Sequence, residues 1–181
     1  MDEALRARVD ELAREVDRLR ALEAIRDRVH GFSRALDRLD RTLLAAQFWP
    51  DAEVDYGVFY KGNVAGFLDV AMGFQGAMRD TQHLVGNVLA QVDGDRASAE
   101  AYVHAHHVIV QGDDLVQLMV GARYLDRFER RNGEWRIAFR TEVIDWGRWL
   151  PVPERWFEQN NEMPKGRRDR DDLSYRYLLP R

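Results

Sequence analysis

The chain has 181 residues, of which 45% are hydrophobic and 32% charged, and a formal net charge of −4. This length fits one folded domain, and the slight negative charge gives no basic surface for phosphates, so no nucleic acid partner is expected. The chain has no cysteine, which excludes disulfides and thiolate chemistry and suits a reducing compartment. We therefore expect a cytoplasmic protein. We expect no membrane partner either, because no window reaches the roughly 18 apolar residues of a membrane span.

Two apolar stripes predict helix in the N-terminal region. The first consists of Leu5, Val9, Leu12, Val16 and Leu19, and the second of Ile25, Val29, Phe32, Leu36, Leu39 and Leu43. Their spacing alternates between three and four residues, and the phase changes at Leu22, so we expect one long helix or two helices with a break near Gly31. The second stripe is expected in the core. The first either forms a coiled coil with another subunit or lies on the domain.

The central region predicts strands joined by tight turns. Pro50 ends the helical region, and we expect a short hairpin at 52–56 and 58–61 and a small helix at 64–78. Four long runs rich in β-forming residues follow, at 81–92, 96–110, 115–130 and 134–146. The residues that connect them, at 93–95, 112–114 and 132–133, include Gly and Asn, which accept the positive φ of hairpin turns. The runs therefore predict an antiparallel meander.

The predicted fold class is α+β, with N-terminal helices inside a strongly curved antiparallel sheet that forms a cone and encloses a pocket. We expect residues 1–22 to be a helical extension, 23–146 the α+β domain, and 147–181 a C-terminal tail. The charges at 165–172 are typical of a solvated segment, but Trp149 and Trp156 favour packing of part of the tail on the domain or a partner subunit. The seam helix and the aromatic tail together favour a homodimer or homotrimer.

Five histidines are candidates for chemistry, and four of them lie on predicted strands. His104 and His106 share one strand face and His107 takes the other. A pair with this spacing can bind a metal, but no carboxylate follows at ligand spacing, so we expect no metal site. The interpretation we favour is that His104 and His106 line the pocket or form hydrogen bonds across the sheet.

His83 begins the first long strand and is a candidate general base. It would need a carboxylate to hold its tautomer and an apolar cavity to exclude water. Asp37, beside the core stripe, could be that carboxylate. The alternatives stay open here: His83 could be structural, and Asp37 with Arg41 could be an ordinary helix pair four residues apart.

The order of elements resembles the SnoaL-like branch of the nuclear transport factor 2-like superfamily. The residues that carry the resemblance are ALEAIRDRVHGFSRALDRLD, FWPDAEVDY, TQHLVGNVLAQVDGD and YLDRFERRNGEWRIAFR. Members with known chemistry include scytalone dehydratase, bile acid 7α-dehydratase, hexachlorocyclohexane dehydrochlorinase and polyketide cyclases. The resemblance implies an α+β cone with a pocket at its mouth.

The resemblance also implies roles for individual residues. Asp37 and His83 match the paired aspartate and histidine of the dehydratases, and Tyr56 resembles a tyrosine that binds the substrate oxygen or a water. Phe32 stands where the bile acid enzyme has a tyrosine, and the late-strand arginine of that enzyme falls near Ile144. Residues implied to bind substrate are Phe32, His104, His106, Arg140 and Trp146, with Arg123 as an alternative to Arg140.

The function implied is a cofactor-independent lyase, dehydratase or isomerase. Its substrate would be a hydrophobic oxygenated small molecule such as a polyketide, steroid or aromatic. In it His83 would take a carbon-bound proton, Asp37 would orient His83, and Tyr56 would polarise a carbonyl or assist the departure of a hydroxyl. Because one fold hosts many functions, two alternatives remain: a non-catalytic binding or assembly module, and a structural β subunit of a ring-hydroxylating dioxygenase.

Overall fold

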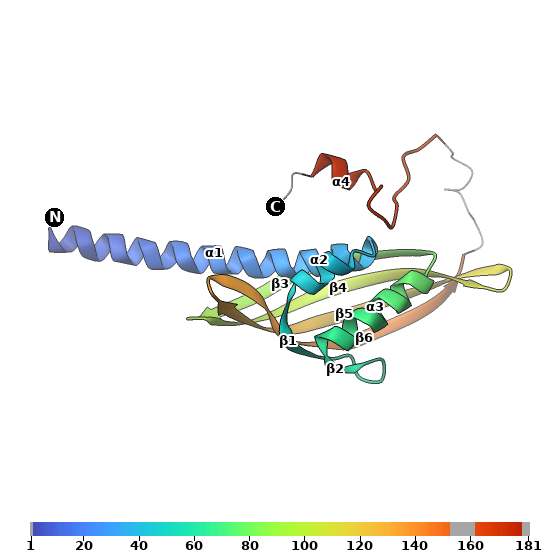
Figure 1. Ribbon diagram of the computed structural model, residues 1–181, viewed down its shortest axis with the longest axis horizontal. Helices are drawn as coiled ribbons and strands as arrows, with labels where there is room; N and C mark the ends of the chain where they lie inside the picture. The colour runs from blue at the N-terminus through green and yellow to red at the C-terminus, as the bar shows by residue number, and fades with distance from the viewer. Residues whose placement is uncertain (1, 153–161, 179–181) are drawn as a thin grey trace.

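The computed structural model describes residues 2–152 and 162–178 (Figure 1). Its elements in chain order are α1 (Glu3–Asp37), α2 (Arg41–Ala46), β1 (Phe48–Asp55), β2 (Lys61–Asn63), α3 (Val64–Ala77), β3 (Asp80–Asp93), β4 (Arg96–Gln111), β5 (Asp114–Arg131), β6 (Glu134–Pro151) and α4 (Ser174–Tyr177). The fold class is α+β, as expected. Within the described residues, no helix is both long and apolar enough to cross a membrane.

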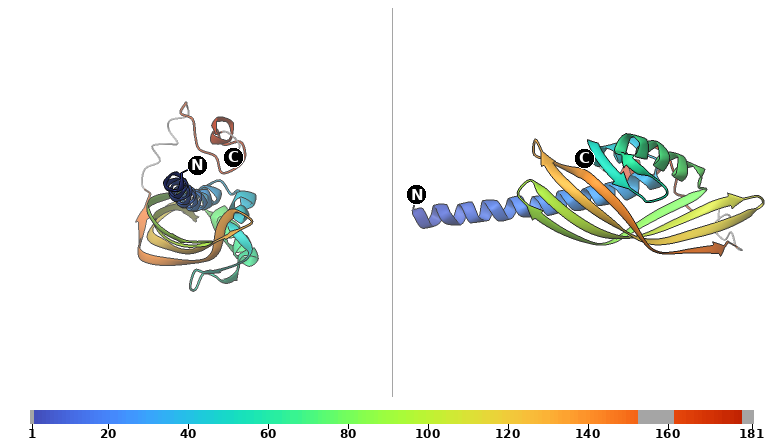
Figure 2. Two further views of the ribbon diagram at one scale, coloured as in Figure 1. Left: turned by 90° about the vertical axis from the view of Figure 1, so that its left-hand side faces the viewer. Right: turned by 90° about the horizontal axis from the view of Figure 1, so that it is seen from below.

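One six-stranded sheet, in the order β2-β1-β6-β5-β4-β3, curves around the C-terminal half of α1 (Figure 2). Strands β3 to β6 form the expected antiparallel meander. The turn between β5 and β6 has positive φ at both Asn132 and Gly133, which matches the hairpin chemistry read from the sequence. One pair differs from the expectation of a wholly antiparallel sheet: β1 runs parallel to β6.

Helix α1 is continuous through Gly31, which agrees with the first of the two alternatives, one long helix, but it ends at Asp37 and does not continue to Leu43. Leu39, at φ 50°, turns the chain into α2, and Asp40 caps that helix by accepting a hydrogen bond from the backbone N–H of Leu43. The first half of α1 extends beyond the sheet (Figure 1). The first apolar stripe is therefore not packed on its own domain, and its side chains are 43–53% exposed.

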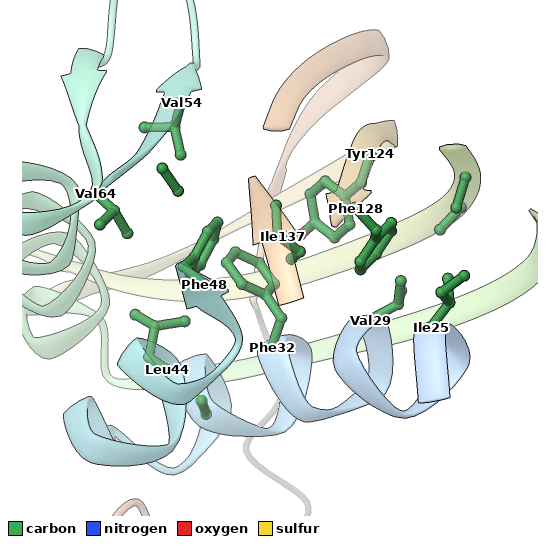
Figure 3. Packing of buried hydrophobic residues seen from close by; sticks show 14 of the residues in the cluster. Ile25, Val29, Phe32, Leu44, Phe48, Val54, Val64, Tyr124, Phe128 and Ile137 are labelled. Atoms are coloured by element: carbon green, nitrogen blue, oxygen red, sulfur yellow. The ribbon is translucent and has the colours of Figure 1, made fainter. Parts of the chain in front are cut away.

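The second stripe packs into the hollow of the sheet (Figure 3). Ile25, Val29 and Phe32 are fully buried there, against residues that include Phe48 and Tyr124. The Phe32 ring lies edge-on to Phe48, with ring centroids 5.8 Å apart, and to Tyr124, at 5.3 Å. This core fixes the end of α1 against the sheet.

Three strands differ from those expected. β2 spans Lys61–Asn63 and not 58–61. β1 begins at Phe48 and includes Pro50, which lies in the irregular stretch of its pairing with β6 and so needs no donor for the ladder. β6 continues past Trp146 to Pro151, so the sheet includes part of the expected tail. Pro153 and Trp156 lie outside the described residues.

Candidate functional site

Asp37 and His83 are in direct contact. His83 Nδ1 lies 2.7 Å from Asp37 Oδ1, and the backbone N–H of His83 donates to Asp37 Oδ2 at 3.0 Å. The hydroxyl of Thr81 donates to the same carboxylate at 3.3 Å. An ionised carboxylate can only accept, so Nδ1 carries the proton and the lone pair of the neutral imidazole lies on Nε2. Arg41, the alternative partner considered for Asp37, pairs with Asp69 at 2.5 Å.

The local fold explains why the two side chains meet. Asp37 is the last residue of α1, one turn beyond Ser33 and two turns beyond buried Val29, so its side chain points toward the sheet. β3 is the edge strand that packs against α1, and on it His83 shares the inner face with Val85. The His83 side chain is only 4% exposed and that of Asp37 12%. The pair is therefore largely withdrawn from solvent.

A cleft of about 270 Å³ opens beside this pair. Its lining residues, which come from α1 and β3, are His30, Ser33, Arg34, Asp37, Arg38, His83 and Val85. Ser33 Oγ is buried there without a hydrogen-bond partner among the described residues. Asp37 and His83 therefore both line this cleft.

His107 lies on the inner side of His83, with the two rings 5.3 Å apart and nearly perpendicular. Its Nε2 is 3.4 Å from Gln75 Nε2, and neither its Nδ1 nor Gln75 Oε1 has a partner within the described part of the chain. Burial, together with the charges of His83 and His106, lowers the pKa of His107 to about 4. His107 is therefore neutral at pH 7 and adds no positive charge beside His83.

A second polar cluster lies deeper in the cone. The Arg140 guanidinium binds Asp126 through two hydrogen bonds of 2.6 and 2.7 Å, and both side chains are 0% exposed. Phe32 and Tyr124 cover the guanidinium, at 4.0 and 4.2 Å from their ring centroids. Burial raises the pKa of Tyr124 well above its usual value.

Tyr56 lies beside this cluster, stacked on Phe67 with ring centroids 4.8 Å apart. Burial raises the pKa of its hydroxyl, so the phenol stays protonated. Both Tyr56 Oη and Arg140 Nη1 are buried without a hydrogen-bond partner among the residues described. A buried donor without a partner is costly, so this part of the interior is suited to an oxygen-bearing ligand or a water.

Known proteins resemble this chain in sequence and in fold. The family model of the SnoaL-like domain matches residues 17–141. The chain belongs to the SnoaL-like family, within the nuclear transport factor 2-like superfamily. The uncharacterized protein Rv2910c of Mycobacterium tuberculosis is 31% identical over 112 residues, which cover 61% of this chain and 72% of the relative.

Solved structures share the fold. A hexachlorocyclohexane dehydrochlorinase, LinA type 2, is 26% identical with a TM-score of 0.68, over 75% of this chain and 93% of that one. A putative scytalone dehydratase of Novosphingobium aromaticivorans is 21% identical with a TM-score of 0.67, over 76% and 93%. The fold is thus that of a family of small-molecule-binding enzymes.

Three of the residues expected to bind substrate lie away from the pair in this SnoaL-like domain. His104 is exposed, opposite Leu84 on the outer face of the sheet, and His106 shares that face. Trp146 is also on the outer face, where its ring lies 5.4 Å from His104. The physical reason is a β-bulge in β6. Gly121 pairs with Trp146 and Ala122 with Ile144, so Asp145 is an extra residue and Trp146 faces outward. The histidine that faces the interior is His107.

The other two residues expected to bind substrate also lie apart from the cleft. Phe32 is fully buried in the aromatic core, and Arg140 is paired with Asp126 beneath it. Arg123, the alternative arginine, forms ion pairs with Glu100 and Asp145. No group of three or more His, Asp or Glu side chains within the described ranges could hold a metal ion.

The sequence reading missed Glu142. It stands directly opposite Tyr124 in the β5–β6 pair and therefore shares the inner face with that buried ring. Glu142 is partly buried, and desolvation raises its pKa to about 6, although the charges of Arg140 and His83 act to lower it. The sequence signal that points to it is its spacing of two residues from Arg140 on the same predicted strand, since such residues share a face.

The C-terminal segment 162–178 lies on the side of α1 away from the sheet (Figures 1 and 2). Arg168 donates to the backbone oxygens of Gln75 and Met78, both at 2.6 Å, at the end of α3. The Tyr175 hydroxyl donates to Asp40 at 3.0 Å, and Asp172 is buried. This segment covers the end of α1 that carries Asp37. Most of the charged residues at 165–172 are exposed, as the charge pattern predicted, but Arg168 is partly buried and Asp172 is buried.

Proposed function

We propose that this SnoaL-like domain is a cofactor-independent lyase, acting as a dehydratase or an isomerase on a hydrophobic oxygenated small molecule. The observation that carries the proposal is the 2.7 Å hydrogen bond between Asp37 and His83 in a largely buried site. A buried imidazole held by a carboxylate is suited to general base catalysis, because the carboxylate fixes the tautomer and stabilises the imidazolium. A polyketide, steroid or aromatic with an acidic C–H bond is the substrate class.

In the proposed reaction, His83 Nε2 takes a proton from a carbon next to a carbonyl group. Asp37 keeps the ring oriented and stabilises its positive charge. Tyr56 donates its hydroxyl hydrogen to the substrate oxygen, for which its protonated phenol is suited, because Arg140 beside it can only donate and leaves that hydrogen available. Proton transfer by a positioned side chain contributes about 10² to 10⁴-fold to a rate, and this chemistry requires no metal or redox cofactor.

The experiment is a screen of the purified protein with scytalone, hexachlorocyclohexane and a panel of hydrophobic hydroxy ketones. The variants are His83→Ala and Tyr56→Phe, with His104→Gln on the outer face as the matched control. We expect His83→Ala to abolish turnover, Tyr56→Phe to cost less, and His104→Gln to stay near the parent rate. If folded His83→Ala turns over a true substrate at the parent rate, the pair is structural and a non-catalytic binding module becomes the better description.

We also propose that the exposed seam of α1 joins two copies of the chain. Leu12, at 50% exposure, lies at the centre of a stripe that the domain leaves uncovered. In an antiparallel pair centred on Leu12, Arg8 of one copy would face Glu15 of the other, which is favourable. Light scattering should therefore give at least the mass of two chains, and a single-chain mass for Leu12→Lys. A single-chain mass for the parent protein, or co-purification with a larger iron–sulfur subunit, would contradict this.

A further inference from the structure

Glu142 carries a carboxyl group on the inner face of the sheet, and the reaction proposed for Asp37 and His83 assigns it no role. It is partly buried and has no hydrogen-bond or ion-pair partner among the described residues. β6 places it two residues beyond buried Arg140, and β5 places Tyr124 directly opposite. Its position is thus set by a rigid sheet and not by a loop.

The groups that face Glu142 come from every element packed around it. They are Arg140 on β6, Tyr124 and Asp126 on β5, Tyr56 at the end of β1, and His83 on β3 with Asp37 of α1 behind it. Arg140 binds Asp126 through two hydrogen bonds, so it is not the ion-pair partner of Glu142. Tyr56 and Tyr124 are neutral phenols. Glu142 is therefore the one carboxyl group among these that is neither hydrogen-bonded nor ion-paired within the described residues.

The environment keeps this carboxyl group protonated at higher pH than usual. Desolvation raises its pKa to about 6, while the charges of Arg140 and His83 oppose that shift. A carboxylic acid with a pKa near the operating pH is effective at giving a proton in a transition state. His83 and Glu142 both face the interior, and the charge of His83 acts on Glu142, so a group that can accept a proton and a group that can donate one lie on the same side of the sheet.

We propose that Glu142 is the general acid of this enzyme, which gives its proton to the hydroxyl group that leaves the substrate. This inference rests on the function proposed above and restricts its substrate class to β-hydroxy carbonyl compounds. His83 takes the proton from the α-carbon, and the electron pair of that C–H bond forms the C=C bond. The C–O bond breaks with its electron pair on oxygen, which takes the proton of Glu142 and leaves as water. Transfer of a proton from His83 to Glu142, directly or through water, restores both groups.

Two matched probes test this step, because they lead to the same product. β-Hydroxypropiophenone and β-chloropropiophenone both eliminate to phenyl vinyl ketone, which is followed by its ultraviolet absorbance. Hydroxide is a poor leaving group and needs a proton, whereas chloride leaves without one. Rates are measured under single-turnover conditions at several pH values, with the uncatalysed rate subtracted. The variants are Glu142→Gln, His83→Gln and, as control, Glu53→Gln, at an exposed position of β1.

For Glu142→Gln we expect a loss of about 10²-fold or more on the hydroxy ketone and a rate near the parent value on the chloro ketone. His83→Gln should lose both activities, and Glu53→Gln neither. On the hydroxy ketone the parent rate should fall as pH rises above about 6, as Glu142 loses its proton. This descending limb should be absent on the chloro ketone and in Glu142→Gln.

The outcomes separate the two proposals. Equal losses of Glu142→Gln on both probes, or no loss on either while His83→Gln is inactive, would overturn the acid role and leave the proposed function intact. A parent rate equal to that of His83→Gln on both probes would overturn the function and this inference together. A readout without substrate is the ¹³C titration of glutamate side-chain carboxyls, with the Glu142 signal assigned from the Gln variant. A titration at the ordinary glutamate value would overturn the inference whatever the rates.

Discussion

The buried ion pair between Arg140 and Asp126 makes a prediction that is independent of function. Asp126→Asn keeps the shape of the side chain but removes its charge, which leaves the guanidinium of Arg140 uncompensated. Both side chains are 0% exposed, and Asp126 accepts two hydrogen bonds from Arg140, of 2.6 and 2.7 Å. Breaking such a pair from one side costs about 3–5 kcal/mol. That is a large share of the about 5–15 kcal/mol that stabilises a typical domain.

The assay is urea unfolding at pH 7, followed by tryptophan fluorescence and circular dichroism. The matched control is Asp145→Asn, which breaks a more exposed pair with Arg123, whose side chain is 27% exposed against 36% for Asp145. Such pairs contribute about 0–1 kcal/mol. The double variant Asp126→Leu with Arg140→Met removes both buried charges and should recover most of the loss. If Asp126→Asn costs no more than Asp145→Asn, the pair is not the dry ion pair described here.

Two further predictions concern stability against pH, with opposite signs. His107 has its pKa lowered from 6.5 to about 4, so the unfolded state takes up a proton first, and stability falls by up to about 3 kcal/mol as pH drops through this window. His107→Gln should remove most of this loss in urea unfolding at pH 4.5 and 7, whereas a parent-like acid sensitivity in that variant would contradict it. Glu142 has its pKa raised from 4.5 to about 6, so its protonated form favours the folded state below pH 4.5, and that contribution of about 2 kcal/mol is lost as pH rises through 6. Glu142→Gln should therefore gain stability relative to the parent between pH 4.5 and 8, and an equal difference at both pH values would count against burial as the cause.

Most of the fold could be predicted from the sequence, because its signals are local. The meander follows from three turns whose residues accept positive φ, and the core face of α1 from the stripe that includes Ile25, Val29 and Phe32. The end of α1 could not be placed, since apolar spacing continues through Leu39 and Leu43 into a separate short helix. The parallel contact between β1 and β6 depends on long-range packing, which periodicity does not report.

The site was only partly predictable for a related reason. Asp37 and His83 were paired through resemblance, but the facing of later residues depends on bulges. The β-bulge opposite Gly121 and Ala122 reverses the facing of β6, so Trp146 points outward. Its ring packs on Gly121 so closely that a Cβ at that position would lie 2.2 Å from it. Glu142 was not among the residues that the sequence singled out. Its inward position follows only once β6 is in register with Tyr124.

The central claim is that His83, held by Asp37, removes a carbon-bound proton. The most direct measurement is the exchange of the α-protons of a hydrophobic cyclic ketone, β-tetralone, in D₂O, followed by ¹H NMR. This exchange needs no leaving group and so reports the base alone. The account predicts that the parent protein accelerates exchange and that His83→Gln abolishes the acceleration. It also predicts that Asp37→Asn reduces the acceleration by about 10²-fold or more while circular dichroism stays that of the parent. Exchange in the presence of His83→Gln as fast as with the parent protein would contradict it.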